Sequence, residues 1–442
     1  MITLPQDVAK IIHTLEEAGY EAYAVGGCVR DSLLGKAPND WDITTSALPE
    51  QVKELFPRTI DTGIQHGTVT VMMHHVGYEV TTYRVDGEYE DSRHPKEVTF
   101  TANLVEDLKR RDFTINAMAY NEKNGLVDEF GGIQDLEKGI IRAVGDPKER
   151  FTEDALRMMR AVRFAAQLGY AIEEKTLSAI KDMAQNLKNI SAERIQTELV
   201  KLLVSDHPEH MCVLYESGIT GVIMPQFDRM METEQNNPHH AYSVGMHTVH
   251  AMEQTGADKV LRLTMLFHDM GKPDTKTTDD DGTDHFHGHA TVSEDYAKTI
   301  LRQLKFDNDT LFKVKKLTYW HDHKISANAK GVRKALNELG EELFLMLLEV
   351  KKADTLAQST YQREEKLAEL SELREIYEQI KKQGDCFQMK DLAVTGQDLI
   401  ALGMKPGPQL GEMLKELLET VIADPTQNEK EKLLQIASKS IF

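Results

Sequence analysis

The chain has 442 residues, 40% of them apolar and 28% charged, a composition typical of a globular protein with roughly two to four domains. A net charge of −20 argues against a broad cationic surface for nonspecific nucleic-acid binding, and three widely spaced cysteines argue against a CxxC metal site. No apolar run reaches the roughly 18 residues of a membrane helix, and "MITLPQDVAK" lacks the basic start and apolar segment of a signal peptide. We therefore expect a cytoplasmic protein that is not bound to a membrane.

Residues 1–140 combine helical and strand patterns. A helix is predicted over residues 8–19, where apolar residues follow helical spacing up to a glycine. A second, short helix is predicted over residues 28–35, directly after a glycine pair. Alternating, β-branched runs predict strands over residues 21–27, 40–45, 67–73 and 78–85. The fold class predicted for this part of the chain is α+β.

The rest of the chain is predicted to be mostly helical. Apolar residues recur at helical spacing in the segments 154–169, 193–204, 260–271, 296–306 and 411–422. Residues 363–384 are highly charged and favour a solvated helix, whereas residues 275–288 have the composition of a loop.

Two aspartates in "NDWDITT", Asp40 and Asp42, are two positions apart in a predicted strand, so their side chains point to the same face. Because the two charges repel each other, a purely structural role explains them poorly. Carboxylate oxygens bind Mg²⁺ together with substrate phosphates, and two such ions can support an in-line phosphoryl transfer. Glu79, in "YEVTTYR", is the candidate for a third carboxylate. We therefore expect two Mg²⁺ ions here.

The segment "VGGCVRDSLLG" precedes these aspartates by about ten residues. A predicted strand ends at Gly26 and Gly27, and a helix begins at once. Glycines let the backbone approach a triphosphate, and a helix N-terminus favours negative charge. Arg30 follows in the first turn, where its guanidinium can bind phosphate oxygens. We therefore interpret Gly27 and Arg30 as parts of a phosphate-binding turn.

The motifs "VGGCVRDSLLG…NDWDITTSALPE", "RRDFTINAMAY" and "RFTEDALRMMRAVRFA" resemble those of class II, bacterial-type tRNA nucleotidyltransferases. These are the CCA-adding enzymes, which are related to the bacterial poly(A) polymerases. The segment "AVTGQDLIALGMKPGPQLGEMLKELLE" resembles the tail of the same family. The resemblance implies addition of C, C and A to tRNA 3′ ends from CTP and ATP, without a nucleic-acid template and without DNA as a partner.

The resemblance also implies a division into four regions. A polymerase-β-like head with a small mixed sheet covers residues 1–140, and a helical neck that selects the nucleotide covers residues 141–205. An all-α body with residues 206–375 and a tRNA-binding helical tail with residues 376–442 follow.

Four residues of the neck, Asp154, Arg157, Arg160 and Arg163, recur every three positions, which places neighbours in the series close together on a helix. Cytosine and adenine both present an amine donor beside a ring-nitrogen acceptor, an edge that Asp154 and Arg157 can match together. The family resemblance gives this pair the same base-selecting role and adds Arg160 and Arg163 as nucleotide contacts. The alternative for the pair is an ion pair on an exposed helix.

Other positions are assigned by the resemblance alone. It places Arg111 of "RRDFTINAMAY" at the bound nucleotide, with Asp112 and Asn116 bracing the junction of head and neck. Residues 84–100 resemble a loop that helps relatives switch from CTP to ATP. The presence of this loop argues against an enzyme that adds only C.

A second constellation lies in the helical half, where His247, His268, Asp269 and Asp354 occur in the order H…HD…D. Imidazole and carboxylate ligands suit Mn²⁺, Ni²⁺ or another divalent metal. The pattern resembles an HD domain, a metal-dependent phosphohydrolase module carried by some relatives, and we expect it to hydrolyse phosphate esters. His289 and His321 could add ligands. The alternative is an HD fold that is only structural.

Three alternative functions remain open from the sequence. The chain could be an A-adding enzyme or a poly(A) polymerase, or an RNA-binding HD phosphohydrolase with a silent head.

Basic residues on the early helices could line a narrow groove for the tRNA end, although ordinary solvated charges explain them equally well. They are Lys181, Lys188, Arg194 and Lys201.

Overall fold

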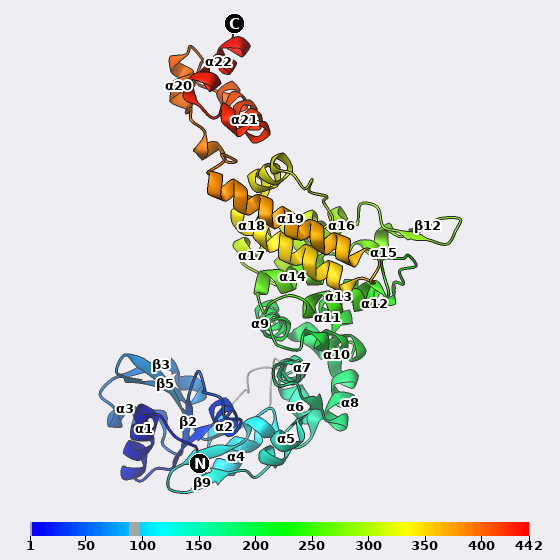
Figure 1. Ribbon diagram of the computed structural model, residues 1–442. Helices are drawn as coiled ribbons and strands as arrows, with labels where there is room; N and C mark the ends of the chain where they lie inside the picture. Colours follow the sequence, from blue (N-terminus) through cyan, green and yellow to red (C-terminus); the bar gives the residue numbers. More distant parts are fainter. Residues whose placement is uncertain (1, 88–97, 442) are drawn as a thin grey trace. The chain divides into compact units, whose positions relative to one another are not determined.

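The computed structural model describes residues 2–87 and 98–441 (Figure 1). The chain divides into two compact units, residues 1–225 and residues 226–442. The middle of the predicted loop at residues 84–100 lies outside the described residues. Among the helices described, none is both long and apolar enough to cross a membrane.

The head contains most of the strands. Its helices and strands are α1 (Gln6–Glu17), β1 (Ala22–Val25), α2 (Gly27–Leu33), β2 (Asp42–Thr45), α3 (Pro49–Leu55), β3 (Thr59–Gly63), β4 (Thr68–Met73), β5 (Val76–Thr82), β6 (Arg84–Asp86), β7 (Val98–Phe100), α4 (Leu104–Lys109), β8 (Ala119–Asn121), β9 (Gly125–Val127) and α5 (Gly132–Lys138).

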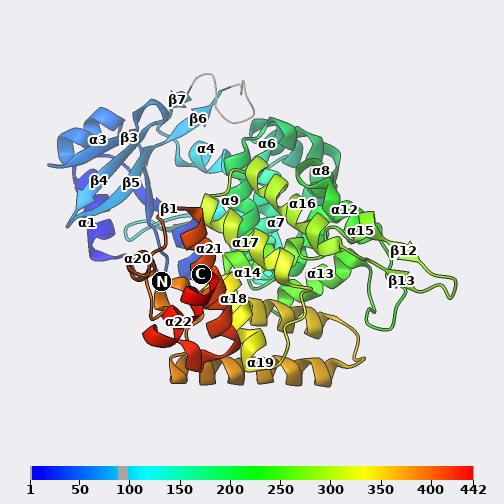
Figure 2. The same cartoon turned by 90° about the horizontal axis from the view of Figure 1, so that it is seen from above.

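A seven-stranded mixed sheet forms the centre of the head, with the strand order β3-β4-β5-β2-β1-β8-β9. Strands β2 and β5 are parallel, and the other neighbours in this sheet are antiparallel. The apolar stripe of α1, with Ile11 and Leu15, is buried, and α3 packs against β4 and β5 (Figure 1 and Figure 2). The prediction of an α+β head with a mixed sheet is therefore confirmed.

The structure corrects the extent of one predicted strand. Strand β2 begins at Asp42, so Asp40 lies in the irregular segment just before it. Strands β3, β8 and β9 were not predicted, because β3 is a polar strand at the edge of the sheet and the other two have only three residues each. Such short or polar strands carry little alternating signal.

The remainder of the first unit is mainly helical. It contains β10 (Ile140–Ile141), α6 (Pro147–Glu153), α7 (Leu156–Leu168), β11 (Ala171–Ile172), α8 (Glu174–Met183), α9 (Ala192–Leu203), α10 (Met211–Glu216) and α11 (Thr220–Ile223), and α12 (Pro225–Glu232) begins at its end. Strands β10 and β11 form a parallel pair, so the predicted all-α neck is wrong at this point. Two-residue strands leave no periodic pattern in a sequence.

The second unit is helical except for one short hairpin. Its elements are α13 (Val244–Glu253), α14 (Lys259–Phe267), α15 (Lys272–Thr275), β12 (Thr277–Thr278), β13 (Asp284–His285), α16 (His289–Gln303), α17 (Asn308–Trp320), α18 (Ala329–Ala357), α19 (Arg363–Gln383), α20 (Gly396–Ala401), α21 (Pro408–Ala423) and α22 (Lys430–Ile441). Strands β12 and β13 form the hairpin within the predicted loop 275–288, so the all-α prediction is wrong here too.

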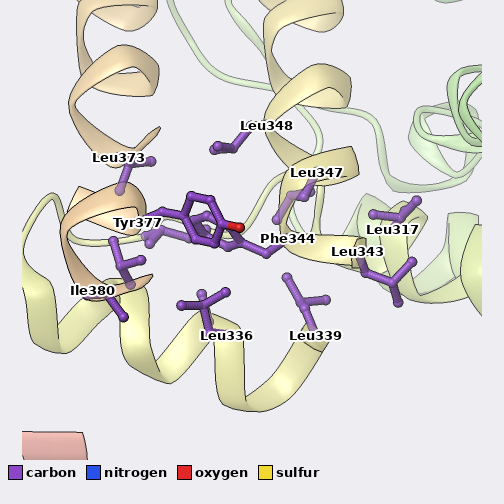
Figure 3. Packing of buried hydrophobic residues seen from close by; sticks show 13 residues of the cluster. Leu317, Leu336, Leu339, Leu343, Phe344, Leu347, Leu348, Leu373, Tyr377 and Ile380 are labelled. Atoms are coloured by element: carbon purple, nitrogen blue, oxygen red, sulfur yellow. The ribbon is translucent and has the colours of Figure 1, made fainter. Parts of the chain in front are cut away.

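Helices α18 and α19 enclose the apolar core shown in Figure 3. Gly340 has a positive φ of 75° and divides α18 into two segments that meet at an angle. Phe344 and Leu347 follow this bend and lie with Tyr377 of α19 in the same cluster (Figure 3). Glycine suits the bend because it adopts a positive φ without steric cost.

A separate apolar cluster holds the tail together. Leu399, Leu417 and Leu433, from α20, α21 and α22, are fully buried in it. The predicted division of the body and tail at residue 375 falls inside α19, between Leu373 and Tyr377 of the first cluster. It stays a prediction, since both clusters belong to the same compact unit.

The core of Figure 3 gives a stability prediction. We expect Phe344→Ala to lower the free energy of unfolding by about 3–5 kcal/mol, because it leaves a cavity among fully buried side chains. Phe312 is the matched control: its side chain is 57% exposed, so Phe312→Ala should change stability by about 0.5 kcal/mol or less. Denaturant unfolding followed by circular dichroism measures both, and equal losses would contradict the packing described.

Candidate active site

A cavity of about 480 Å³ in the first unit collects most of the residues singled out in the head and neck. It is lined by Gly26, Gly27, Arg30, Asp42, Arg110, Arg111, Asp112, Asn116, Asp154, Leu156, Arg157, Arg160, Arg163, Phe164 and Arg194. Asp40 and Glu79 are not part of this lining. The cavity is therefore strongly cationic, although the whole chain is acidic.

The glycine turn closes one side of the cavity. Gly26 has a φ of +83°, and a Cβ atom at this position would lie 3.0 Å from Nη1 of Arg111. The backbone and the Arg111 guanidinium can approach each other only because Gly26 has no side chain. This close approach brings Gly27 and the start of α2 to the cavity wall.

Arg30 is held in place by three neighbours. Its Nη1 donates to Oδ1 of Asn116 at 2.6 Å, and its Nε donates to Oδ1 of Asp31 at 2.9 Å. The guanidinium also lies 5.0 Å from the centre of the Phe164 ring. These contacts fix the Arg30 guanidinium beside the glycine turn, and its role in binding phosphate stays a prediction.

The candidate metal-binding carboxylates lie at the beginning of β2 and in β5. Asp42 is the first residue of β2, and Asp40 precedes it by two positions. The parallel pairing of Ile43 with Val80 places Glu79 level with Asp42 on the neighbouring strand. Residues that are level in adjacent strands present their side chains on the same face.

The pKa values of Asp42 and Glu79 are raised, in part by the charges of neighbouring carboxylates. Burial raises the pKa of Glu79, and the charges of Asp42 and Asp40 raise it further. Burial also raises the pKa of Asp42; Arg111 opposes this rise and Asp40 adds to it. Within the described structure, the oxygens of the three side chains do not all lie within 4.8 Å of one another. A divalent cation would relieve the mutual repulsion of these carboxylates, and the side chains would have to come closer together than they lie here to share it.

Arg111 carries a guanidinium suited to an anion. Its Nη2 lies 3.7 Å from Oδ2 of Asp107, and its Nε is buried without a hydrogen-bond partner among the described residues. Burial lowers the pKa of Arg111, because charged groups are less stable away from water. A buried donor without a partner is costly, and a phosphate oxygen in the cavity would remove that cost.

Asp154 and Arg157, the pair predicted to select the base, are arranged differently from the prediction. Asp154 is not part of a continuous helix but ends α6, with extended backbone angles, before α7 begins. Its Oδ2 accepts a hydrogen bond from Nη2 of Arg194 at 2.6 Å, and its Oδ1 accepts one from the backbone N–H of Leu156. Arg157 donates to Glu153 at 2.5 Å. The alternative of an Asp154–Arg157 ion pair on an exposed helix is therefore wrong.

Arg160 and Arg163 belong to a buried network. Arg160 donates from Nε and Nη2 to Oδ2 of Asp112, at 2.8 and 2.6 Å. Burial alone would raise the pKa of Asp112, but the charge of Arg160 holds this pKa well below its usual range. Arg163 donates to Glu198 at 2.8 Å and lies 3.5 Å above the Phe164 ring. Both arginines line the cavity and are tied to the protein at the same time.

Three residues of this site were not predicted from the sequence or were predicted elsewhere. Arg194 was expected on a tRNA groove, but it lines the nucleotide cavity and holds Asp154. The roles of Phe164 and Glu198 were not predicted, although Phe164 directly follows Arg163 in the motif. Lys181, Lys188 and Lys201 are exposed on the early helices.

A second candidate site lies in the second unit. The ligand atoms of His247, His268 and Asp354 all lie within 4.8 Å of one another, and so do those of Asp269, His289 and His321. Five of these six residues are buried, and Asp354 is partly buried. The structure therefore brings together the four predicted HD residues and the two additional histidines, in a set that can hold a metal ion.

Known proteins match this chain along most of its length. Three family models match: the poly A polymerase head domain over residues 22–142, the probable RNA and SrmB-binding site of polymerase A over residues 169–231, and the tRNA nucleotidyltransferase domain 2 over residues 285–437. None of these three describes an HD domain, so the HD interpretation depends on the side chains around Asp269.

Individual relatives extend the match. The CCA-adding enzyme of Levilactobacillus brevis is 39% identical over 96% of this chain and 95% of its own, and that of Leuconostoc mesenteroides is 37% identical over 99% and 98%. The crystal structure of the Bacillus stearothermophilus CCA-adding enzyme in complex with CTP has a TM-score of 0.78 and 32% identity, and covers 99% of this chain and 98% of its own. The chain belongs to the family of CCA-adding enzymes.

Proposed function

We propose that this protein completes tRNA 3′ ends by adding C, C and A from CTP and ATP, without a nucleic-acid template. The observation that carries the proposal is the single cavity lined both by Asp42, where the chemistry is expected, and by Asp154 and Arg157, where the base is expected. The relatives that match nearly the whole chain are CCA-adding enzymes, which supports full CCA addition over an A-adding enzyme or a poly(A) polymerase. Since tRNA and both nucleotides occur in the cytoplasm, we place the reaction there.

Asp40, Asp42 and Glu79 are the residues that would hold two Mg²⁺ ions. The pKa values of Asp42 and Glu79 are raised partly by neighbouring carboxylates, and bound cations would offset this repulsion. When bound, the ions would neutralise charge on the triphosphate and activate the tRNA 3′-hydroxyl for attack on the α-phosphate. The protein's own part is to place these carboxylates at the edge of a cavity that also holds the nucleotide.

The triphosphate would lie between the glycine turn and the arginines. Gly27 leaves room for the phosphates, and Arg30 and Arg111 supply positive charge on either side. Arg30 is already fixed by Asn116 and Asp31, so little side-chain entropy is lost when a phosphate binds. Arg111 supplies the buried Nε–H that lacks a partner.

The base would be read by Asp154 and Arg157. Asp154 only accepts hydrogen bonds and Arg157 only donates them, a combination that fits the shared edge of cytosine and adenine. Uracil and guanine present a carbonyl where the amine should be, which leaves unmatched polar groups at about 1–3 kcal/mol each. Arg194 holds the Asp154 carboxylate in one orientation, and Arg160 and Arg163 extend the cationic wall beside the nucleotide.

The four-region division remains part of this proposal. The head would carry the chemistry, the neck would select the base, and the tail with residues 376–442 would bind tRNA. Exposed Lys181, Lys188 and Lys201 are suited to a narrow contact with the tRNA backbone.

A second activity is proposed for the HD residues. His247, His268 and Asp354, together with Asp269, would hold one Mn²⁺, Ni²⁺ or similar ion and support hydrolysis of phosphate esters. The specific observation in its favour is the convergence of these side chains from α13, α14 and α18 on one point. Three separate helices place ligands there, which a purely structural role does not require.

The first test uses tRNA transcripts that end before the CCA sequence, after one C or after two. We expect the wild-type protein to add the missing nucleotides in each case, and failure to use CTP would contradict the proposal. Asp42→Asn should lower incorporation of CMP and AMP by about 10³-fold, because a metal-binding carboxylate is lost. The exposed head carboxylate in Asp61→Asn is the matched control and should leave the rate unchanged.

The second test concerns base selection. Asp154→Asn replaces one acceptor oxygen by an amide donor, which can pair with the carbonyl of uracil. We expect the preference for CTP over UTP, measured as a ratio of kcat/KM values, to fall roughly 10- to 100-fold. Glu149→Gln makes the same chemical change on the exposed side of α6 and should leave the ratio as it is. Unaltered selection in Asp154→Asn would exclude Asp154 as a base contact.

The third test addresses the HD residues. With Mn²⁺ or Ni²⁺ present, we expect the full-length protein to hydrolyse bis(p-nitrophenyl) phosphate, and His268→Ala to abolish this activity and reduce bound metal. His250→Ala, on the solvent side of α13, is the control that should keep both. Equal activity of wild type and His268→Ala would rule the site out.

A further inference from the structure

Asp107 on α4 is a fully buried carboxylate that has no part in the reaction proposed above. Its side chain is 0% exposed, and α4 is followed directly by Arg110 and Arg111, which line the nucleotide cavity. Burial alone would raise the pKa of Asp107, but the charges of Arg110 and Arg111 hold this pKa below its usual value. A buried charge is costly unless it is paired, so the partners of Asp107 indicate its role.

The two carboxylate oxygens of Asp107 contact different parts of the head. Oδ1 accepts a hydrogen bond from Nε of Arg110 at 3.0 Å. Oδ2 accepts one from the hydroxyl of Thr44 at 3.1 Å and lies 3.7 Å from Nη2 of Arg111. Thr44 follows Asp42 by two positions in β2, so both side chains lie on the same face of the sheet. Asp107 therefore lies against the face of β2 that also carries Asp42.

The Arg111 guanidinium is attracted by both of these aspartates. Burial lowers the pKa of Arg111, and the charges of Asp107 and, less strongly, Asp42 oppose this change. Among the residues that the structure describes, however, Arg111 forms an ion pair with Asp107 and none with Asp42. Its Nη1 lies beside the glycine turn, where a Cβ atom at Gly26 would be only 3.0 Å away. The guanidinium is thus placed through Nη1 and Nη2, and the buried Nε–H is left to bind a ligand.

We propose that Asp107 is a positioning residue for nucleotide binding, which keeps the Arg111 guanidinium from pairing with Asp42. Arg111 then stays available to a phosphate of the nucleotide, and Asp42 stays available to a divalent cation. This inference rests on the proposed function, since it assumes that Arg111 binds the triphosphate. Asp112, another carboxylate near Arg111, is already paired with Arg160. If Asp107 were neutral, Arg111 would therefore turn to Asp42.

Neutralising Asp107 separates this role from a general effect of charge. If only long-range electrostatics mattered, removal of a negative charge near the cavity would tighten the binding of an anion such as CTP. Positioning gives the opposite sign, because in Asp107→Asn the Arg111 guanidinium would pair with Asp42 and bind CTP more weakly. Removal of the Asp42 charge as well would release Arg111 again. A general loss of packing around α4 would not be repaired by a change on β2.

The test measures the affinity of the full-length protein for CTP by equilibrium dialysis in EDTA, so that no divalent cation contributes to binding. We expect Asp107→Asn to weaken CTP binding about 10-fold, because one charge-assisted contact to phosphate is lost. Asp107→Asn combined with Asp42→Asn should bind CTP as tightly as Asp42→Asn alone. Glu106→Gln is the matched control: it neutralises a partly buried carboxylate on the same helix, outside the cavity lining, and should leave the affinity as it is.

Unchanged or tighter CTP binding in Asp107→Asn, or a loss that Asp42→Asn does not restore, would overturn the inference. Binding of CTP by the wild type with Mg²⁺ but not in EDTA would also overturn it, because Arg111 would then not hold the phosphates by itself. A wild type that binds CTP under neither condition would instead reject the proposed function.

Asp42→Asn alone decides the question should Asp107→Asn not fold. CTP binding in EDTA that is as tight as in the wild type, or tighter, would support Asp107 as the partner that places Arg111. Weaker binding would assign that role to Asp42 and overturn the inference.

Discussion

The pairing of Asp112 with Arg160 is the constraint on which the candidate active site depends. Asp112 is buried, and one of its oxygens accepts two hydrogen bonds from the Arg160 guanidinium on α7. Its other oxygen accepts hydrogen bonds from Asn116 and from the backbone of Phe113. Asn116 in turn accepts a hydrogen bond from Arg30 in α2. A continuous series of hydrogen bonds thus joins α7 to the glycine turn at the start of α2. Breaking such a pair would leave a buried charge without its partner, at a cost of about 3–5 kcal/mol. These hydrogen bonds therefore hold α7 and the glycine turn in a fixed position relative to each other.

The same network explains how an acidic chain can bind a polyanion. Seven arginines line the nucleotide cavity: Arg30, Arg110, Arg111, Arg157, Arg160, Arg163 and Arg194. Most of them are paired with carboxylates such as Asp31, Asp107, Glu153 and Asp112, so the cavity is not an uncompensated cluster of positive charge. The carboxylates keep the arginines oriented. A triphosphate would have to compete with these carboxylates for the arginines, and this competition would limit the affinity gained from each contact. The chain as a whole has a net charge of −20, while arginines predominate in the lining of this cavity.

The features that could be predicted from the sequence arise from residues that are close together along the chain. The alternation in β4 and β5 is a pattern of neighbouring residues, and both segments are strands in the structure. The spacing of Asp40 and Asp42 predicted one strand for both, but only Asp42 belongs to β2. The partner of Asp154 could not be predicted, because Arg194 is 40 residues away and the contact arises from the packing of α7 against α9. The break at Asp154 was missed for a related reason: the helical spacing of the motif continues across it. The strands β10 to β13 have two residues each, which is too short to leave a periodic pattern, and β10 and β11 are also fixed by pairing between separate segments of the chain.

The donor atoms separate the two candidate metal sites chemically. In the head, the donors are carboxylate oxygens from a strand edge, which suit Mg²⁺ and leave coordination positions for phosphates and water. In the second unit, four imidazoles and two carboxylates are drawn from several helices into a mostly buried set, which suits softer, transition-metal ions. The ligand atoms themselves therefore favour different metals at the two candidate sites, although one chain carries both.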